Sequence, residues 1–110
     1  MSAAPRDPPR QSEAQRIDKW LWFARFFKAR ERAAAFIEEG RMRLAHPGGA
    51  TERVAKPSQL VRQGDVLTFV LGQAVRVVRV EAPGRRRGPL AEAKLLYTDL
   101  SQKGHDSNVI

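Results

Sequence analysis

The sequence predicts an α+β domain in which two N-terminal helices pack on a small antiparallel sheet and a short helix follows the last strand. Two features of the residue pattern indicate this class. Apolar residues recur at helical spacing between residues 17 and 39, and after Gly40 the apolar period changes to two. A chain of 110 residues with 42% hydrophobic content has room for one small core flanked by tails.

The two helices are expected over the most strongly periodic stretch. The first begins at Ile17, and a short basic corner at Lys28–Arg30 follows it. A second helix is predicted over residues 31–39, and Gly40 stands where a left-handed residue commonly ends a helix. The expected apolar side of the first helix consists of Ile17, Leu21, Ala24, Trp20 and Phe27, and its basic face carries Arg16, Lys19, Phe23 and Phe26.

Short runs of alternating apolar residues predict the sheet. The expected strands are residues 42–44, 53–55, 66–71 and 74–80. Pro57 ends the second of them because proline cannot donate to a ladder, and Gln63-Gly64-Asp65 makes a turn before the third. The last two runs form a hairpin. A final apolar pattern over residues 90–97 predicts a short helix opened by Pro89.

Composition divides the chain into four parts. Residues 1–15 contain three of the seven prolines and little to bury, so they are expected to form a disordered arm. Residues 16–82 form the domain, and residues 83–104 add a basic loop with the C-terminal helix. Residues 105–110 are expected to be a disordered tail.

The charge of the chain indicates an anionic partner. A formal net charge of +8 and a pI near 11.0 favour nucleic acid or an acidic membrane surface. The absence of cysteine excludes disulfides and cysteine-ligated zinc. No apolar run approaches the roughly 18 residues that span a bilayer, and the first fifteen residues lack a secretory pattern. We therefore expect a cytoplasmic protein without a membrane partner.

The segment from Arg16 to Arg32 combines cations with aromatic rings. Lysine and arginine release counterions when they neutralise phosphates, and arginine also grips a phosphate with two parallel hydrogen bonds. Phe23 lies between two cations, where its ring either stacks on a base, worth ~1–3 kcal/mol, or packs inside the domain. The basic residues of the segment are Arg16, Lys19, Arg25, Lys28, Arg30 and Arg32.

A second basic cluster consists of Arg85, Arg86 and Arg87, between Gly84 and Gly88. Three consecutive arginines in a loop suit phosphate contacts in irregular RNA, and a solubilising linker is the competing interpretation. Lys56 and Ser58 lie beside a bend fixed by Pro57. On their own they are better explained as an ordinary strand end.

No residues form a recognisable catalytic or metal site. His46 and His105 lie in a turn and in the tail, without the spacing of zinc ligands. Glu38 and Glu39 are adjacent on a helix, so their carboxylates diverge. No glycine-rich phosphate loop or nucleophile motif is present. We therefore expect a protein that is not an enzyme and uses no metal or cofactor.

A set of spaced residues resembles the S-four domain, an RNA-binding module with the alpha-L motif that recurs in tRNA synthetases and pseudouridine synthases. Residues 18–30 and 85–97 are in addition similar to the ribosome-associated heat shock protein 15 family, in which this module stands alone. The S-four pattern comprises Arg16-Ile17-Asp18-Lys19, Leu21, Arg30, Ala33, Ile37, Gly40, Lys56-Pro57-Ser58 and Gly64-Asp65.

The resemblance implies a function. Members of the family bind structured ribosomal RNA on large subunits that keep a nascent chain on its tRNA after premature subunit dissociation, and the function expected here is rescue of such subunits during heat stress. The resemblance also implies that Asp18 orients a neighbouring arginine or the helix start. We expect a monomer off the ribosome, with tRNA as a second RNA candidate. The RNA contacts that the resemblance implies are Arg16, Lys19, Arg25, Lys28 and Arg30, with Lys56 and Ser58 as secondary contacts. The residue pattern itself adds Phe23, Arg85, Arg86 and Arg87.

The chain departs from the family pattern in three places. Ala29 replaces the usual serine or threonine before the second helix, which costs about 1 kcal/mol of capping. The usual tight hairpin is replaced by the longer stretch 44–54, and the expected charged extension is curtailed soon after Tyr97. Two other functions stay open: a basic regulatory or targeting module that binds a protein or an acidic membrane, and an accessory RNA-binding domain of an RNA-modifying system.

Overall fold

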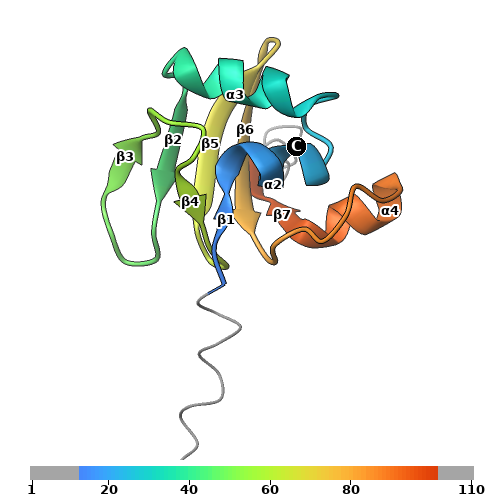
Figure 1. Cartoon of the computed structure of the whole chain (residues 1–110). Helices are drawn as coiled ribbons and strands as arrows, with labels where there is room; N and C mark the ends of the chain where they lie inside the picture. The colour runs from blue at the N-terminus through green and yellow to red at the C-terminus, as the bar shows by residue number, and fades with distance from the viewer. Residues whose placement is uncertain (1–12, 102–110) are drawn as a thin grey trace, which may run out of the picture.

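The computed structural model describes residues 13–101 and has the α+β fold class that the sequence predicts. Helices α2 (Ile17–Phe23) and α3 (Arg30–Glu38) lie on one face of a five-stranded antiparallel sheet, as Figure 1 shows. A short helix, α4 (Leu90–Ala93), and a 3-10 turn (Lys94–Leu96) follow the sheet's central hairpin. Residues 1–12 of the expected arm and the whole of the expected tail 105–110 lie outside the described residues.

The main sheet is antiparallel throughout, in the order β3-β2-β5-β6-β7. A second, two-stranded sheet pairs the start of the domain with the segment before β5. The strands of the main sheet are β2 (Met42–Ala45), β3 (Thr51–Arg53), β5 (Val66–Leu71), β6 (Ala74–Val80) and β7 (Tyr97–Asp99), and those of the small sheet are β1 (Gln15–Arg16) and β4 (Leu60–Val61).

The core lies between the two helices and the sheet. Alternate residues of the strands point toward the helices, because successive side chains in a strand leave on opposite faces. Trp20 is fully buried at the centre, and its indole Nε1 donates to the carbonyl of Ala82 at 2.9 Å. The buried residues around it include Ile17, Leu21, Ala33, Ile37, Met42, Leu44, Leu67, Phe69, Val78 and Val80.

Helix α2 ends four residues earlier than the periodicity suggests, at Phe23. Arg25 adopts the left-handed conformation with φ of 67°, and the N–H of Phe26 donates to the carbonyl of Leu21 at 3.0 Å. The N–H of Arg25 donates to Trp22 at 3.1 Å, so the two bonds together form a Schellman motif. The reversed chain turns Phe26 into the core, so its predicted position on the basic face is wrong.

Aromatic rings form a continuous cluster under the end of α2. The Phe26 ring lies 4.7 Å from Tyr97 and 5.5 Å from Phe69, measured between centroids. Phe36 contacts both Phe69 and Phe27, at 6.2 and 5.3 Å. Such tilted and edge-on pairs add to the free energy gained by burial alone. The turn after α2 is therefore anchored by its own side chains.

Other expectations need correction at the edges of elements. The return strand of the first hairpin is β3, two residues earlier than expected, and the buried Val54 follows it. The predicted terminal helix ends before Tyr97, which begins strand β7 instead. Gln15, expected in the disordered arm, lies in β1 and pairs with Val61. The left-handed position of Gly40, with φ of 78°, is confirmed.

The described residues contain no candidate membrane span and no candidate metal site. Within residues 13–101, no helix is long and apolar enough to cross a bilayer. In the same range, no three histidine, cysteine, aspartate or glutamate side chains are arranged to hold a metal ion.

A carboxylate links the neighbouring strands β6 and β7. The carboxylate of Glu81, just after β6, accepts from the Thr98 hydroxyl at 2.6 Å and from Arg79 Nε at 2.9 Å. The hydrogen bond from Thr98 and the weaker effect of Arg79 hold the pKa of Glu81 below its ordinary value of 4.5. A lowered folded-state pKa contributes stability above the unfolded value, and this contribution is lost as the pH falls through the folded value.

The Thr98→Val variant tests this link. We expect its free energy of unfolding at pH 7 to be lower than that of the native chain by about 1 kcal/mol, because one charge-assisted hydrogen bond is lost. The difference should shrink as the pH falls below 4.5. Urea titrations from pH 7 to pH 3 measure it. Thr68→Val, on the open face of β5, is the control, and an equal, pH-independent loss in both variants would contradict the prediction.

Candidate nucleic-acid interface

The segment 56–59 packs against the beginning of α2. The carbonyls of Gln59 and Pro57 accept from the first two N–H groups of the helix, at 2.7 and 3.3 Å. These bonds satisfy two of the donors that a helix start leaves without a partner inside the helix. Lys56 and Ser58 are exposed on this segment. The fold therefore brings the two predicted secondary contacts beside α2, which their distance in the sequence does not reveal.

Asp18 joins the basic residues of the two helices. Its carboxylate, 5% exposed, accepts from Arg16 Nε and Nη2 at 3.2 and 3.1 Å and lies 3.7 Å from Arg30 Nε. The hydrogen bond that Arg16 donates to Asp18, followed by the negative charge of Asp18, raises the pKa of Arg16. The expected orienting role of Asp18 is thus confirmed. Because one acid serves two arginines, the group keeps a net positive charge.

Phe23 is not the exposed ring that stacking on a base requires. Only 6% of the residue is exposed, so this part of the prediction is wrong. Gly84 lies directly against the ring, and a Cβ at that position would come within 2.5 Å of it. Lys19 stays outside, with its Nζ 5.6 Å from the ring centroid. The ring is therefore a packing contact between α2 and the C-terminal basic loop.

The basic loop 84–88 is fastened to β1 and to the turn after α2. Gly84 exchanges two hydrogen bonds with the side chain of Gln15, at 2.9 and 3.0 Å. Arg25 Nε donates to the carbonyl of Gly88 at 2.7 Å. The basic segment 16–32 and the basic loop 84–88, far apart in the sequence, are therefore adjacent in the fold.

The three arginines of this loop differ in what they contact. Arg87 donates to the carbonyls of Trp22 and Phe27, both at 3.2 Å, and lies 5.5 Å from the Trp22 ring. Arg86 forms a two-point ion pair with Glu92, whose hydrogen bond raises the pKa of Arg86. Arg85 is exposed, with no partner among residues 13–101. Arg87 is thus mainly structural, and Arg85 is the loop's free cation in this range.

Every predicted contact residue lies on α2, on the turn after it, or on a segment that contacts α2. Lys28 is exposed in the turn, and Arg30 opens α3 after Ala29, which makes no side-chain capping bond. Gln15 and Gly84 were not predicted, because no local pattern marks a hydrogen-bonded pair so far apart in sequence. We call the following residues the basic cluster: Arg16, Lys19, Arg25, Lys28, Arg30, Lys56 and Arg85.

Known proteins resemble this chain over most of its length. Heat shock protein 15 of Escherichia coli K12 is 40% identical over 87 residues, which are 79% of this chain and 61% of that protein. The heat shock protein 15 homolog of Aeromonas salmonicida is 36% identical over 104 residues, which are 93% of this chain and 74% of the relative. This chain belongs to the heat shock protein 15 family. No protein-family model matches it.

A solved structure supports the family assignment at the level of the fold. Heat shock protein 15 of Vibrio cholerae, described as trimeric, superposes with a TM-score of 0.72 at 33% identity. The match covers 87% of this chain and 93% of that chain. Both the fold class and the family resemblance seen in the sequence are thereby confirmed. The aligned part of this chain spans 61% of the length of the Escherichia coli heat shock protein 15.

The Asp18→Asn variant tests the ion pairs that Asp18 forms with Arg16 and with Arg30 of α3. An amide cannot neutralise two guanidinium groups, so we expect the free energy of unfolding to fall by about 1–3 kcal/mol. Urea denaturation at pH 7 measures it. Glu31→Gln, an exposed acid in the first turn of α3, is the matched control and should stay within about 0.5 kcal/mol of the native chain. Equal losses in both variants would contradict the prediction.

The Gly84→Ala variant tests the packing of the basic loop on α2. The added Cβ would overlap the Phe23 ring, so the loop must shift, at a cost of about 1–3 kcal/mol. Gly49→Ala is the control because its Cβ would meet only ordinary contacts, 3.5 Å away or more. Thermal unfolding compares the two. A Gly84→Ala protein as stable as Gly49→Ala would show that the loop is not held against the ring.

Proposed function

We propose that this protein is a non-enzymatic RNA-binding protein of the cytoplasm that docks on structured ribosomal RNA of the large subunit. The observation that carries the proposal is the gathering of both basic segments around α2, through the contacts of Arg25, Gly84 and Asp18. The biological role follows the family resemblance: rescue of large subunits that retain a nascent chain on its tRNA during heat stress.

Charge and exposure support phosphate binding. Lys19, Lys28 and Arg85 have no carboxylate partner within residues 13–101, so their charges are available to a ligand. Each phosphate that such a cation neutralises releases counterions, which makes the affinity depend on salt. The cations stand on a rigid helix and on loops fastened to it. A rigid array of this kind suits a folded RNA, which proteins recognise by shape and backbone more than by sequence.

The burial of the apolar side of α2 weighs against the membrane alternative. A helix that lies on a membrane presents its aromatic residues to the acyl chains. Here Trp20 is fully buried and Phe26 packs on Tyr97 and Phe69. Only Lys19 and Trp22 of α2 are not buried, and the guanidinium of Arg87 lies over the Trp22 ring. A cation therefore borders each accessible part of the helix, which favours an RNA ligand.

The association state is a separate part of the proposal. The expectation from the sequence is a monomer off the ribosome, whereas the solved Vibrio cholerae relative is described as trimeric. The contacts that build the basic cluster all form within one chain. We therefore propose that a single copy carries a complete RNA-binding surface.

The double variant Lys19→Glu/Lys28→Glu tests the proposal. Neither lysine forms an ion pair in residues 13–101, so the reversal should leave the fold intact. We expect the variant to leave large ribosomal subunits at moderate salt, and the slope of log affinity against log salt to become shallower by about 1.4–1.8, the value for two phosphate contacts. Co-sedimentation with separated subunits across a salt series measures both quantities.

The matched control is Arg43→Glu/Arg53→Glu. These arginines are cross-strand partners of β2 and β3 on the sheet face opposite the helices, and the reversal changes the net charge by the same amount. The control should bind subunits almost as the native chain does. If both double variants lose subunit binding equally, the effect is explained by net charge alone. If Lys19→Glu/Lys28→Glu binds subunits as the native chain does, the proposed interface is refuted.

A further inference from the structure

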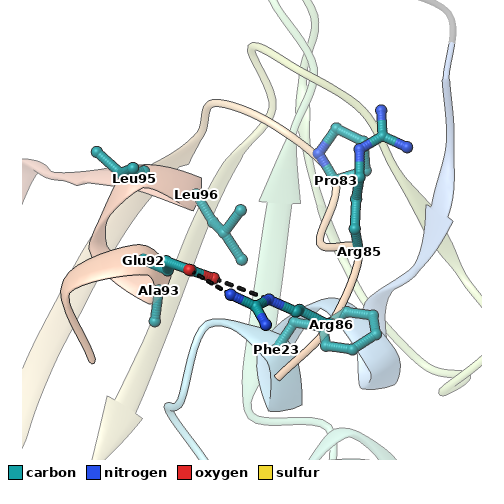
Figure 2. A pocket seen from close by; sticks show the side chains of 8 residues that line it. All are labelled: Phe23, Pro83, Arg85, Arg86, Glu92, Ala93, Leu95 and Leu96. Carbon is teal, nitrogen blue, oxygen red and sulfur yellow. Dashed lines mark hydrogen bonds and ion pairs between the residues drawn. The ribbon is translucent and has the colours of Figure 1, made fainter. Parts of the chain in front are cut away.

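A pocket of about 420 Å³ lies between α2, the basic loop and the C-terminal helical turn. Small-molecule sites in proteins run from about 300 to about 1,000 Å³, so this volume suits a compact ligand. In Figure 2, Phe23 lies at one end of the pocket, and Leu95 and Leu96 lie on the side of the 3-10 turn. Of the residues that line the pocket, only Arg85 belongs to the basic cluster.

The apolar wall of the pocket is incomplete without a ligand. Leu95 is 73% exposed, the highest value among the large hydrophobic residues that are exposed in the described chain. Phe23 contributes only an edge, because Gly84 covers its ring. Leu96 packs partly against the core, so its position is fixed. A flat apolar group placed here would therefore cover Leu95 against a rigid support.

The rim of the pocket is cationic. Arg85 has no partner in residues 13–101, and Arg86 reaches from the loop to Glu92 on α4, as the dashed lines in Figure 2 show. The single carboxylate is thus already engaged, and Arg85 adds an unneutralised charge. Lys19, over the Phe23 ring, adds another nearby. The ligand that fits carries a negative charge next to a flat, weakly polar body.

We propose that this pocket takes one unpaired nucleotide of the bound RNA, with its base against Leu95 and Leu96 and its phosphate on Arg85. The inference rests on the proposed function and names a feature of the RNA that it would recognise. Bases in bulges and loops are free to leave the stack, whereas those of a continuous duplex are not. Phe23 lines the pocket, and Lys19 of the basic cluster lies over its ring. One RNA strand can therefore contact the pocket and the basic cluster together.

The test compares two hairpin RNAs that differ only in one unpaired nucleotide, which is 2-aminopurine. The full chain should bind the bulged hairpin about tenfold more tightly than the paired one, which corresponds to ~1.4 kcal/mol. The fluorescence of the 2-aminopurine should change on binding as the base leaves its neighbours. Titrations at one salt concentration give both readouts, and the same titrations across a salt series give the salt slope.

The discriminating variant is Leu95→Ala, with Leu90→Ala as its control. Both leucines are exposed, at 73% and 55%, so neither substitution should affect folding, and only Leu95 lines the pocket. Leu95→Ala should bind both hairpins equally while keeping the affinity of the native chain for the paired one. Leu90→Ala should keep the preference. Arg85→Gln should weaken the bulged complex and make its salt slope shallower by about 0.7.

Three results would overturn the inference. In the first, the native chain does not prefer the bulged hairpin, or the preference survives Leu95→Ala, while ribosome binding still depends on Lys19 and Lys28. This result would leave the proposed function standing without the nucleotide pocket. The second is loss of ribosome binding in Leu95→Ala with unchanged hairpin binding, which would assign the pocket to a protein segment. The third is no binding of either hairpin together with subunit binding that ignores the Lys19→Glu/Lys28→Glu change, which would refute both proposals.

Discussion

The end of helix α2 is the point on which the rest of the structure depends. The left-handed Arg25 stops the helix at Phe23 and reverses the chain, at a cost of about 1–2 kcal/mol for a residue with a side chain. Phe26 recovers this cost by packing on Tyr97 and Phe69. Arg87 then donates to the carbonyl of Trp22, which also accepts from the N–H of Arg25, at a helix end that favours a cation. Core, turn and basic loop are thus fixed together.

This arrangement separates cations that hold the fold from cations that remain available. Arg87 and Arg86 are engaged by backbone carbonyls and by Glu92, although they are neighbours of the free Arg85 in sequence. Asp18 plays a similar part in the helices, since it positions Arg16 and Arg30 without cancelling their joint charge. A count of basic residues therefore overstates the charge that a ligand meets. The cluster's geometry matters more than its number of cations.

The elements with a regular period could be predicted from the sequence, and the contacts between distant segments could not. The alternation in β5 and β6 and the glycine at position 40 identified the sheet and the end of α3. The early end of α2 was missed because the left-handed residue is Arg25, and sequence rules expect glycine there. The burial of Phe23 was missed because it depends on Gly84. Such contacts leave no local signal in the sequence.

The hydrogen bonds between Gln15 and Gly84 join residues 69 positions apart, so they set an order of events during synthesis. Helix α2 leaves the ribosome early, but the loop that fastens its C-terminal end is made only after most of the chain. In a nascent chain, Lys19 and the cations that flank α2 are therefore present before the loop that completes this surface has been made.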